Sequence, residues 1–161
     1  MNRLSVVATA ALFALLVPTT SSYASAATQP PKAQWPARGT ILRLPAIPWP
    51  NWKPGHRGID IEMSLGDAVS SPVNGRVVWV GVVAHEPSIS IVADGLKHTL
   101  VPVDSSLTKG DLVAAGESVG ALTSSSHCGS RTCLHWSVRR GSDYLDPRWV
   151  AQPLLRRGSP R

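Results

Sequence analysis

Residues 127–136 read HCGSRTCLHW and contain side chains that can bind a metal, form a disulfide or act in catalysis. The segment holds His127, His135 and the only two cysteines of the chain, Cys128 and Cys133. Imidazole nitrogens and thiolates are ligands that zinc prefers, and a histidine near a cysteine can also activate a thiol nucleophile. Two cysteines in an oxidising compartment instead form a disulfide. The residue types alone therefore leave a metal site, a disulfide and a nucleophile open.

A second group of candidate ligands lies in GHRGID, where His56 precedes Asp60 by four residues. Positions four apart share one face of a strand but are about 13 Å apart when the strand is straight. A shared ion therefore requires a bend, which Gly58 permits. Together with His135, these residues supply two imidazoles and a carboxylate, the ligand set of a catalytic zinc site that keeps its fourth position for water. Histidines with purely structural hydrogen bonds would fit the same spacing.

The N-terminal residues predict the compartment. Arg3 precedes an apolar core over residues 4–17, and ASA at 24–26 offers a cleavage site of the A-x-A type. This pattern predicts a signal peptide over residues 1–26, cleaved after Ala26, because the apolar core is too short to span a bilayer. The protein is then secreted or bound to the cell envelope, with no stable membrane span after processing. A non-cleaved membrane anchor is the alternative.

Export bears directly on the cysteines. An oxidising compartment favours a disulfide between Cys128 and Cys133, and it disfavours Cys133 as a thiol nucleophile. The loop between them is short, so the disulfide is expected to shape the loop more than it stabilises the fold. A zinc ribbon would need two cysteine pairs, and the sequence has one.

The charge balance limits the classes of partner. The chain has 16 basic and 10 acidic residues, and only Arg3 among them lies in residues 1–26, which leaves the processed protein with a formal charge of +5. For an exported protein this favours anionic polymers such as cell-wall or membrane-surface phosphates. The arginines are dispersed and no stripe of aromatic and basic residues is present, so nucleic acid is not expected as a partner. A basic surface that only keeps the protein soluble is the alternative.

Short β segments dominate the sequence after about residue 55. Runs such as GRVVWVGVV and SISIVA are rich in β-branched residues or alternate polar with apolar residues, and clusters of Gly, Pro, Asp and Ser separate them. No window of 11 residues has a helical apolar stripe. The pattern predicts an all-β domain of about a hundred residues, either a β-sandwich or a partly open barrel.

A segment rich in proline and tryptophan, residues 27–53, precedes the β segments. Proline neither donates to a β-ladder nor continues a helix, so this segment is expected to be extended. Part of it is expected to pack on the domain through Trp35, Trp49 and Trp52. An aromatic lip that faces a substrate is the alternative.

Two segments within the chain resemble each other. LGDAVSSPVNGRV at 65–77 and KGDLVAAGESVGA at 109–121 share Gly-Asp-x-Val, followed by small residues and a later glycine. They predict two similar turns that lead into two similar strands. Chance repetition of a common turn would produce the same match.

The motifs occur in the order of a known family. GHRGIDI, followed about seventy-five residues later by CLHWSVRRG and YLDP, resembles the LytM/lysostaphin-type zinc metallopeptidases that cut peptidoglycan. The segments GDAVSSPVNGRVVWVG, DGLKHTLVPV and KGDLVAAGESVGAL are similar to the family as well. The resemblance covers residues 54–149 as a peptidase-like domain and leaves residues 150–161 as a basic tail. It implies a β-sandwich of the duplicated hybrid motif type, consistent with the two similar segments.

The resemblance also implies a ligand set. The metal ligands of the family fall on His56, Asp60 and His135, which implies one Zn²⁺ per chain. The family uses two further histidines that orient or deprotonate the water and stabilise the oxyanion. The places of these two histidines hold Cys133 and Pro102 in this sequence.

One residue is a candidate replacement for the missing histidines. A disulfide between Cys128 and Cys133 would brace the loop of His127 against the strand of His135, so that His127 reaches the water in place of Cys133. A histidine that is simply exposed in a loop is the alternative.

Other titratable residues are expected outside the centre. His98 lies four residues before Pro102, too far along its strand to replace the missing histidine, and His85 is expected at the surface. Glu62 shares a strand face with Asp60. It is therefore either a residue that supports the metal ligands or part of a solvated strand edge.

The sequence thus predicts an exported, zinc-binding, peptidoglycan endopeptidase-like protein that hydrolyses cell-wall peptide bonds by a metal-activated water. The alternative is a catalytically degenerate module of the same fold that binds the cell wall or activates another hydrolase, because each missing acid–base group costs about 10²–10⁴-fold in rate. A third hypothesis is a disulfide-bonded secreted β module with structural histidines. The expected partners are peptidoglycan peptides, with anionic cell-wall polymers or another cell-wall hydrolase as further candidates.

Overall fold

The computed structural model describes residues 33–124 and 127–151 of the 161-residue chain. The predicted signal peptide and all but two residues of the predicted basic tail lie outside the described residues. Within the described ranges, no helix is long and apolar enough to cross a membrane. The elements follow in this order: β1 (Ile41–Arg43), β2 (Gly58–Glu62), β3 (Ala68–Ser70), β4 (Gly75–Val83), β5 (Glu86–Ala93), β6 (Leu96–Val101), β7 (Val103–Asp104), β8 (Leu112–Val113), β9 (Ser118–Leu122), β10 (Cys133–Arg140), β11 (Asp143–Leu145) and α1 (Pro147–Val150).

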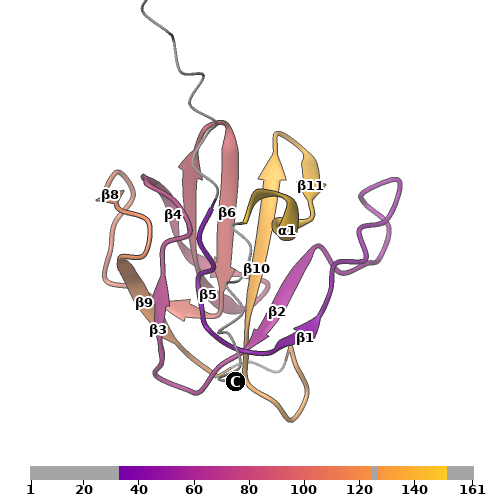
Figure 1. The fold of residues 1–161 in the computed structure, drawn as a ribbon, viewed down its shortest axis with the longest axis horizontal. Helices are drawn as coiled ribbons and strands as arrows, with labels where there is room; N and C mark the ends of the chain where they lie inside the picture. Colours follow the sequence, from indigo (N-terminus) through magenta and orange to yellow (C-terminus); the bar gives the residue numbers. More distant parts are fainter. Residues whose placement is uncertain (1–32, 125–126, 152–161) are drawn as a thin grey trace, which may run out of the picture.

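The strands form two open antiparallel sheets (Figure 1). The larger sheet has the order β1-β2-β10-β6-β5-β4-β8, with β11 paired to β10 beside this path, and the smaller sheet has the order β3-β9-β7. Residues of both sheets share one apolar core, for example Ile59, Leu100 and Trp136 of the larger sheet with Val69 and Val119 of the smaller. The predicted all-β, sandwich-like fold is therefore confirmed.

Alternation along the central strands separates this core from an outer face. In β10 Leu134, Trp136 and Val138 are buried in the core, whereas the alternate residues His135, Ser137 and Arg139 are partly exposed. Strand β6 repeats the pattern, with the odd-numbered residues of 97–101 on the partly exposed side. Successive strand side chains point to opposite faces, so these residues share one outer face of the larger sheet.

The register of β10 fixes which outer-face residues are neighbours. His135 is opposite Asp60 of β2 on one side and Val101 of β6 on the other, and Arg139 is opposite Lys97 of β6. Directly opposite residues of an antiparallel pair have Cβ atoms about 4.5–5.5 Å apart. The pairing of strands that are distant in sequence therefore decides which side chains meet on this face.

The proline-rich N-terminal segment packs on the sandwich through Trp35. The ring of Trp35 meets Trp136 edge to face, with ring centroids 5.6 Å apart. Trp49 and Trp52 are 86% and 79% exposed, so the expectation that they also pack on the domain is wrong. Part of the segment thus packs on the domain, as its composition indicates.

The two similar segments fold into the same kind of turn. Oδ2 of Asp67 accepts a hydrogen bond from the backbone N–H of Ser64 at 2.8 Å, and Oδ2 of Asp111 accepts one from the backbone N–H of Thr108 at 2.8 Å. The glycine before each aspartate has a positive φ, 82° and 111°. This backbone region favours glycine. The two similar turns predicted from the sequence are therefore confirmed.

One histidine belongs to the core. His98 on β6 is 1% exposed, and its ring stacks on Trp136 with centroids 6.0 Å apart. Because it lies on the core face, it does not reach the groups of the outer face. Burial lowers the pKa of His98 from 6.5 to about 4. A charged ring at this place would be held away from water with no opposite charge to compensate.

We expect His98 to make the free energy of unfolding depend on pH. The unfolded chain binds a proton on this ring below about pH 6.5, whereas the folded protein does so only near pH 4, so stability falls as the pH drops through this window. Between pH 7 and pH 5 the loss is about 2 kcal/mol. Urea unfolding of chelator-treated wild type and of His98→Gln at both pH values measures it. The variant should lose about 2 kcal/mol less; the same pH response in both proteins would contradict the assignment.

Candidate metal centre

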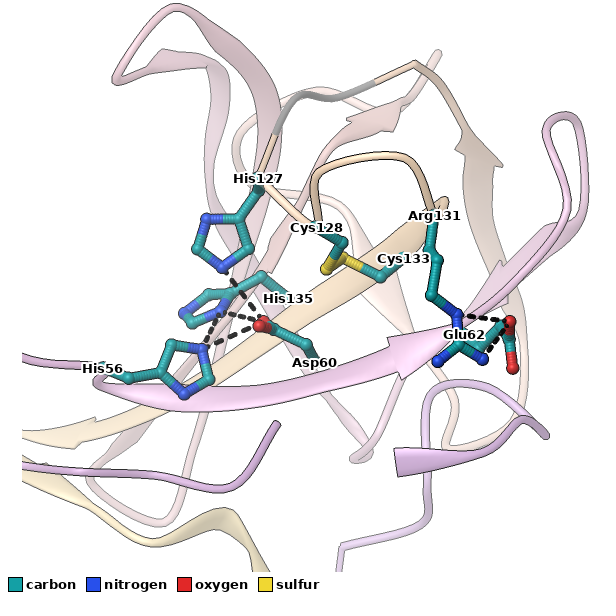
Figure 2. The surroundings of a disulfide bond; sticks show 8 residues. All are labelled: His56, Asp60, Glu62, His127, Cys128, Arg131, Cys133 and His135. Atoms are coloured by element: carbon teal, nitrogen blue, oxygen red, sulfur yellow. Dashed lines mark hydrogen bonds and ion pairs between the residues drawn. A yellow bond between two sulfur atoms is a disulfide. The ribbon is translucent and has the colours of Figure 1, made fainter. Parts of the chain in front are cut away.

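Four of the residues predicted from sequence meet at one place on the outer face (Figure 2). Asp60 is in the middle of β2, His135 is opposite it on β10, and His56 precedes β2 in an isolated bridge with Ala46. His127 reaches the same place from the loop before β10. Their candidate ligand atoms all lie within 4.8 Å of one another. Two regions that are far apart in sequence, residues 56–60 and 127–135, thus supply one cluster of donors.

The shortest contacts converge on Oδ1 of Asp60. This oxygen is 2.7 Å from Nδ1 of His135, 3.0 Å from Nε2 of His56 and 3.1 Å from Nε2 of His127. Nε2 of His56 and Nδ1 of His135 are 3.2 Å apart. Ligand atoms about 2.1 Å from a tetrahedral zinc ion are about 3.4 Å from one another. His56, Asp60 and His135, which we call the metal triad, therefore have nearly the spacing that a shared ion requires.

A backbone contact decides how His56 presents its ring. Nδ1 of His56 is 2.8 Å from the carbonyl oxygen of Leu44 and donates to it, so in the neutral ring Nε2 carries a lone pair. That lone pair faces Oδ1 of Asp60, and two acceptors at 3.0 Å repel each other unless a cation or a proton lies between them. A ring N–H donated to a carbonyl is the usual support of a metal-bound histidine. The donor set therefore fits a zinc ion.

Burial and mutual contacts favour an ionised Asp60 and a neutral His135. Asp60 is 1% exposed. Burial alone would raise the pKa of Asp60, but the hydrogen bond with His135 and the nearby histidine charges outweigh it and hold that pKa below its ordinary value. Burial lowers the pKa of His135, although Asp60 opposes this shift. Metal ligands must be deprotonated to bind, so both shifts favour metal binding near neutral pH.

Gly58 makes room for the ring of His135. A Cβ on Gly58 would lie 2.7 Å from Nε2 and 2.8 Å from Cε1 of His135, and it would also clash with the carbonyl oxygen of Trp136. Gly58 is the first residue of β2, between His56 and Asp60 in sequence. Its role is thus steric, because the absence of a side chain makes room for the ring of the third ligand.

We expect Gly58→Ala to weaken zinc binding about 10–100-fold, because the added methyl group displaces the ring of His135. Competition with a chromogenic zinc chelator measures the affinity. Gly75→Ala is a matched control, since its Cβ would lie 2.7 Å from Cγ2 of Ile91 and 2.8 Å from the carbonyl oxygen of Val92, away from the centre. The control should destabilise the fold and leave zinc affinity unchanged. Wild-type affinity in Gly58→Ala would show that the ring has another way to reach the ion.

The loop that carries His127 is fastened to the strands at two points (Figure 2). Cys128 and Cys133 form a disulfide, as the sequence predicts. Arg131 donates to Oε1 of Glu62 on β2, through Nε at 3.0 Å and Nη2 at 2.6 Å. Glu62 is therefore partly solvent-exposed, as the strand-edge interpretation expects, and its side chain, 39% exposed, pairs with Arg131 of the loop rather than with a metal ligand.

The double variant Cys128→Ser/Cys133→Ser is expected to lose at most about 2 kcal/mol of unfolding free energy, because the disulfide closes a short loop. Backbone amides of residues 128–133 should exchange with solvent faster, which hydrogen-exchange mass spectrometry detects. Zinc content should stay at about one per chain, since the metal triad does not depend on the loop. Loss of zinc from this variant would show that the loop itself holds the ion.

The two places where the family has its other histidines contain no imidazole. Cys133 is buried and bonded to Cys128, so it has no free thiol. Pro102 follows β6 and lines a pocket of about 320 Å³ together with His127. Within the described residues, His127 is the one further imidazole at the metal triad.

A groove of about 400 Å³ extends from the metal triad across the outer face. Its floor comes from alternate residues of β10 and β6 and from Ser90 of β5, and its walls include Arg57, Trp79 and Tyr144. Sequence reasoning missed these residues. One signal could have found part of the floor, because steps of two from His135 along β10 lead to Ser137 and then Arg139.

Comparison of the chain with protein families gives a match to Peptidase family M23 over residues 54–147. Two uncharacterized proteins, from Mycobacterium tuberculosis (strain ATCC 25618 / H37Rv) and Mycobacterium bovis, are each 33% identical over 121 residues. The match covers 70% of this chain and 49% of each relative. The chain therefore spans about half the length of the curated relatives it matches.

Solved structures share the fold at low identity. Helicobacter pylori Csd3 has a TM-score of 0.63 at 21% identity, over 76% of this chain and 35% of that chain. A zinc containing peptidase from Vibrio cholerae has a TM-score of 0.61 at 19% identity, over 72% and 39%. Lysostaphin from Staphylococcus simulans has a TM-score of 0.53 at 21% identity, over 59% and 43%. With the fold shared and the family match covering more than half of the sequence, this chain belongs to peptidase family M23.

Proposed function

We propose that this chain is an exported zinc peptidase that hydrolyses peptide bonds of peptidoglycan at the metal triad. The observation that carries the proposal is the contact between His56 and Asp60. The Nδ1–H of His56 donates to the carbonyl oxygen of Leu44, so the lone pair on Nε2 points toward the buried carboxylate of Asp60. A cation shared by the two groups stabilises this arrangement. Membership of a peptidase family supports hydrolysis, and the groove beside the triad supports a peptide as the substrate.

In this proposal each residue of the metal triad binds through the atom that already faces the others. His56 binds through Nε2, His135 through Nδ1 and Asp60 through Oδ1. A zinc ion bound there would polarise the substrate carbonyl and lower the pKa of a water molecule, so that the water attacks at neutral pH. The carbonyl of Leu44 keeps the ring of His56 in the tautomer that can bind.

Hydrolysis also needs a group that carries a proton from the attacking water to the leaving nitrogen, and we assign this role to His127. Its Nε2 is 3.1 Å from Oδ1 of Asp60, and its ring centroid is 5.0 Å from that of His135. Its side chain is 39% exposed and lines the groove, so a substrate can approach it. The imidazole takes the proton as the water oxygen bonds to the carbonyl carbon, and returns it to nitrogen as the C–N bond breaks.

A cell-wall binding module is the second candidate, and one observation favours it. Cys133 lies in a disulfide and Pro102 has no side-chain donor, so a single imidazole, His127, remains where the related peptidases use two. Such a module would grip peptidoglycan peptides or activate another hydrolase without cutting. It would keep the groove and the metal triad.

Digestion of purified peptidoglycan by the processed chain, residues 27–161, separates the two candidates. The enzyme is expected to release new amino termini, to stop after chelation, and to recover with about one equivalent of zinc. A protein that holds zinc and pellets with peptidoglycan, but releases no amino termini, would instead be the binding module. Protein without any zinc after gentle purification would exclude both.

Export has its own test. N-terminal sequencing of the protein recovered from the cell envelope or the medium should begin at Ala27, directly after the proposed cleavage site. An intact N-terminus in a membrane fraction would favour a non-cleaved anchor. Neither result alters the assignment of the metal triad.

A further inference from the structure

The groove that leads away from the metal triad is built in rows across three paired strands. Ser137 of β10 is opposite Thr99 of β6, and Thr99 is opposite Ser90 of β5, to which its hydroxyl is hydrogen-bonded at 2.8 Å. Two residues further along β10, the next row brings Arg139 opposite Lys97. All five residues line the groove. With distance from the metal triad, the floor therefore changes from imidazoles to hydroxyls and then to two cations.

Lys97 and Arg139 set two like charges directly opposite each other, an arrangement that destabilises a sheet. Among the described residues that line the groove there is no aspartate or glutamate, and neither cation takes part in any ion pair found among them. Arg57, the other arginine of the groove, is different, because its guanidinium donates to the backbone carbonyls of Asn51 and Lys53. The pair thus has no evident role in holding the fold together.

The pKa of Lys97 reflects its burial and the nearby positive charge of Arg139. Burial lowers the pKa of Lys97 from its ordinary value of 10.5, and the positive charge of Arg139 lowers it further. An anion between the two side chains would relieve their repulsion and favour the charged lysine. A carboxylate suits them best, because the guanidinium fork matches its two oxygens and the ammonium adds a further charge-assisted hydrogen bond.

We propose that Lys97 and Arg139 form a subsite for a carboxylate of the bound peptide, so that the substrate is an acidic peptide and not a neutral one. The inference rests on the proposed function for the site of cleavage. Arg139 is four residues from His135 on β10, about 13 Å along the strand. An extended peptide whose scissile carbonyl lies at the metal triad would therefore carry the carboxylate about three to four residues away.

Binding of matched peptides tests the subsite without requiring hydrolysis. The probes are fluorescent, N-acetylated and C-amidated hexapeptides of alanine and glycine that contain one glutamate or one glutamine, placed at each position in turn. At the best position, the wild type should bind the glutamate peptide about ten-fold more tightly than its glutamine twin. Raising the salt to about 0.5 M should shrink this preference, because the contact is between charges near the surface.

Variants show whether the two cations cause the preference. Lys97→Gln/Arg139→Gln should bind both peptides equally, whereas Arg140→Gln removes a positive charge from the next residue, outside the groove, and should keep the preference. Thermal unfolding checks that both variants fold. Equal or undetectable binding of the two peptides by the wild type, or an unchanged preference in the double variant, overturns the subsite.

These outcomes can be told apart from those of the proposed function. A protein that prefers the glutamate peptide but never cuts peptidoglycan keeps the subsite and loses the peptidase assignment. A protein that cuts peptidoglycan but binds the glutamate and glutamine peptides equally keeps the peptidase assignment and loses the subsite.

Discussion

Replacing His135 by alanine is expected to strip zinc from the protein and to abolish release of amino termini from peptidoglycan. The variant keeps only His56 and Asp60, whereas catalytic zinc sites have three protein ligands. One ligand accounts for a quarter to a third of the binding free energy of a typical site, so zinc affinity should fall on the order of 10²–10³-fold or more. Metal analysis after dialysis and the amino-terminus assay measure the two effects on the same sample.

A histidine outside the metal triad provides the matched control. His85 lies exposed in the turn between β4 and β5 with a φ of 69°, a conformation that asparagine tolerates. His85→Asn should therefore retain full zinc content and full hydrolysis. A His135→Ala protein that holds zinc and cuts like the wild type would remove the metal triad from the mechanism altogether.

The strands that carry these ligands are predictable from sequence because one face of each is buried. In LHWSVR, burial of Leu134, Trp136 and Val138 imposes a period of two, and the residues between them must then share the opposite face. The same reasoning places Asp60 between the buried Ile59 and Ile61. Local alternation of residue types is thus enough to predict an all-β fold and the strand face of Asp60 and His135.

The contact between His56 and Asp60 does not follow from spacing and strand geometry, and the sequence implies it only through the resemblance to a known family. A straight strand would separate the two residues by about 13 Å, yet their ligand atoms are 3.0 Å apart. His56 lies before β2 begins, pairs with Ala46, and has its ring oriented by the carbonyl of Leu44. Every residue type has a backbone carbonyl, so the sequence does not show that the carbonyl of Leu44 orients the ring of His56.

Contacts between distant strands escape prediction for a different reason. The pairing of Lys97 with Arg139 follows from the register of β6 against β10, which depends on the packing of the whole sheet. The disulfide beside His127 is predictable, but the ion pair between Arg131 and Glu62 that also fastens this loop joins residues 69 positions apart. The spacing of residues along the chain does not predict the pairing of Lys97 with Arg139 or of Arg131 with Glu62.

Removing the imidazole of His127 is expected to lower kcat about 10²–10⁴-fold, while zinc content stays at about one per chain. The expectation follows from its place beside Oδ1 of Asp60, on a loop and not on a strand of the metal triad. Peptidoglycan turnover by His127→Ala at saturating substrate, with metal analysis of the same protein, gives both quantities. The rate should also lose part of its pH dependence, which a residue of purely structural importance would not cause.

The double variant Cys128→Ser/Cys133→Ser gives the graded comparison for His127→Ala, because it keeps the imidazole and loosens only its support. Its kcat should fall between those of the wild type and His127→Ala. Wild-type kcat in His127→Ala would mean that hydrolysis needs no imidazole beyond the metal triad, and that the loop serves another purpose. Joint loss of zinc and kcat would make His127 a fourth ligand, and a site closed by four protein ligands favours the binding module over the peptidase.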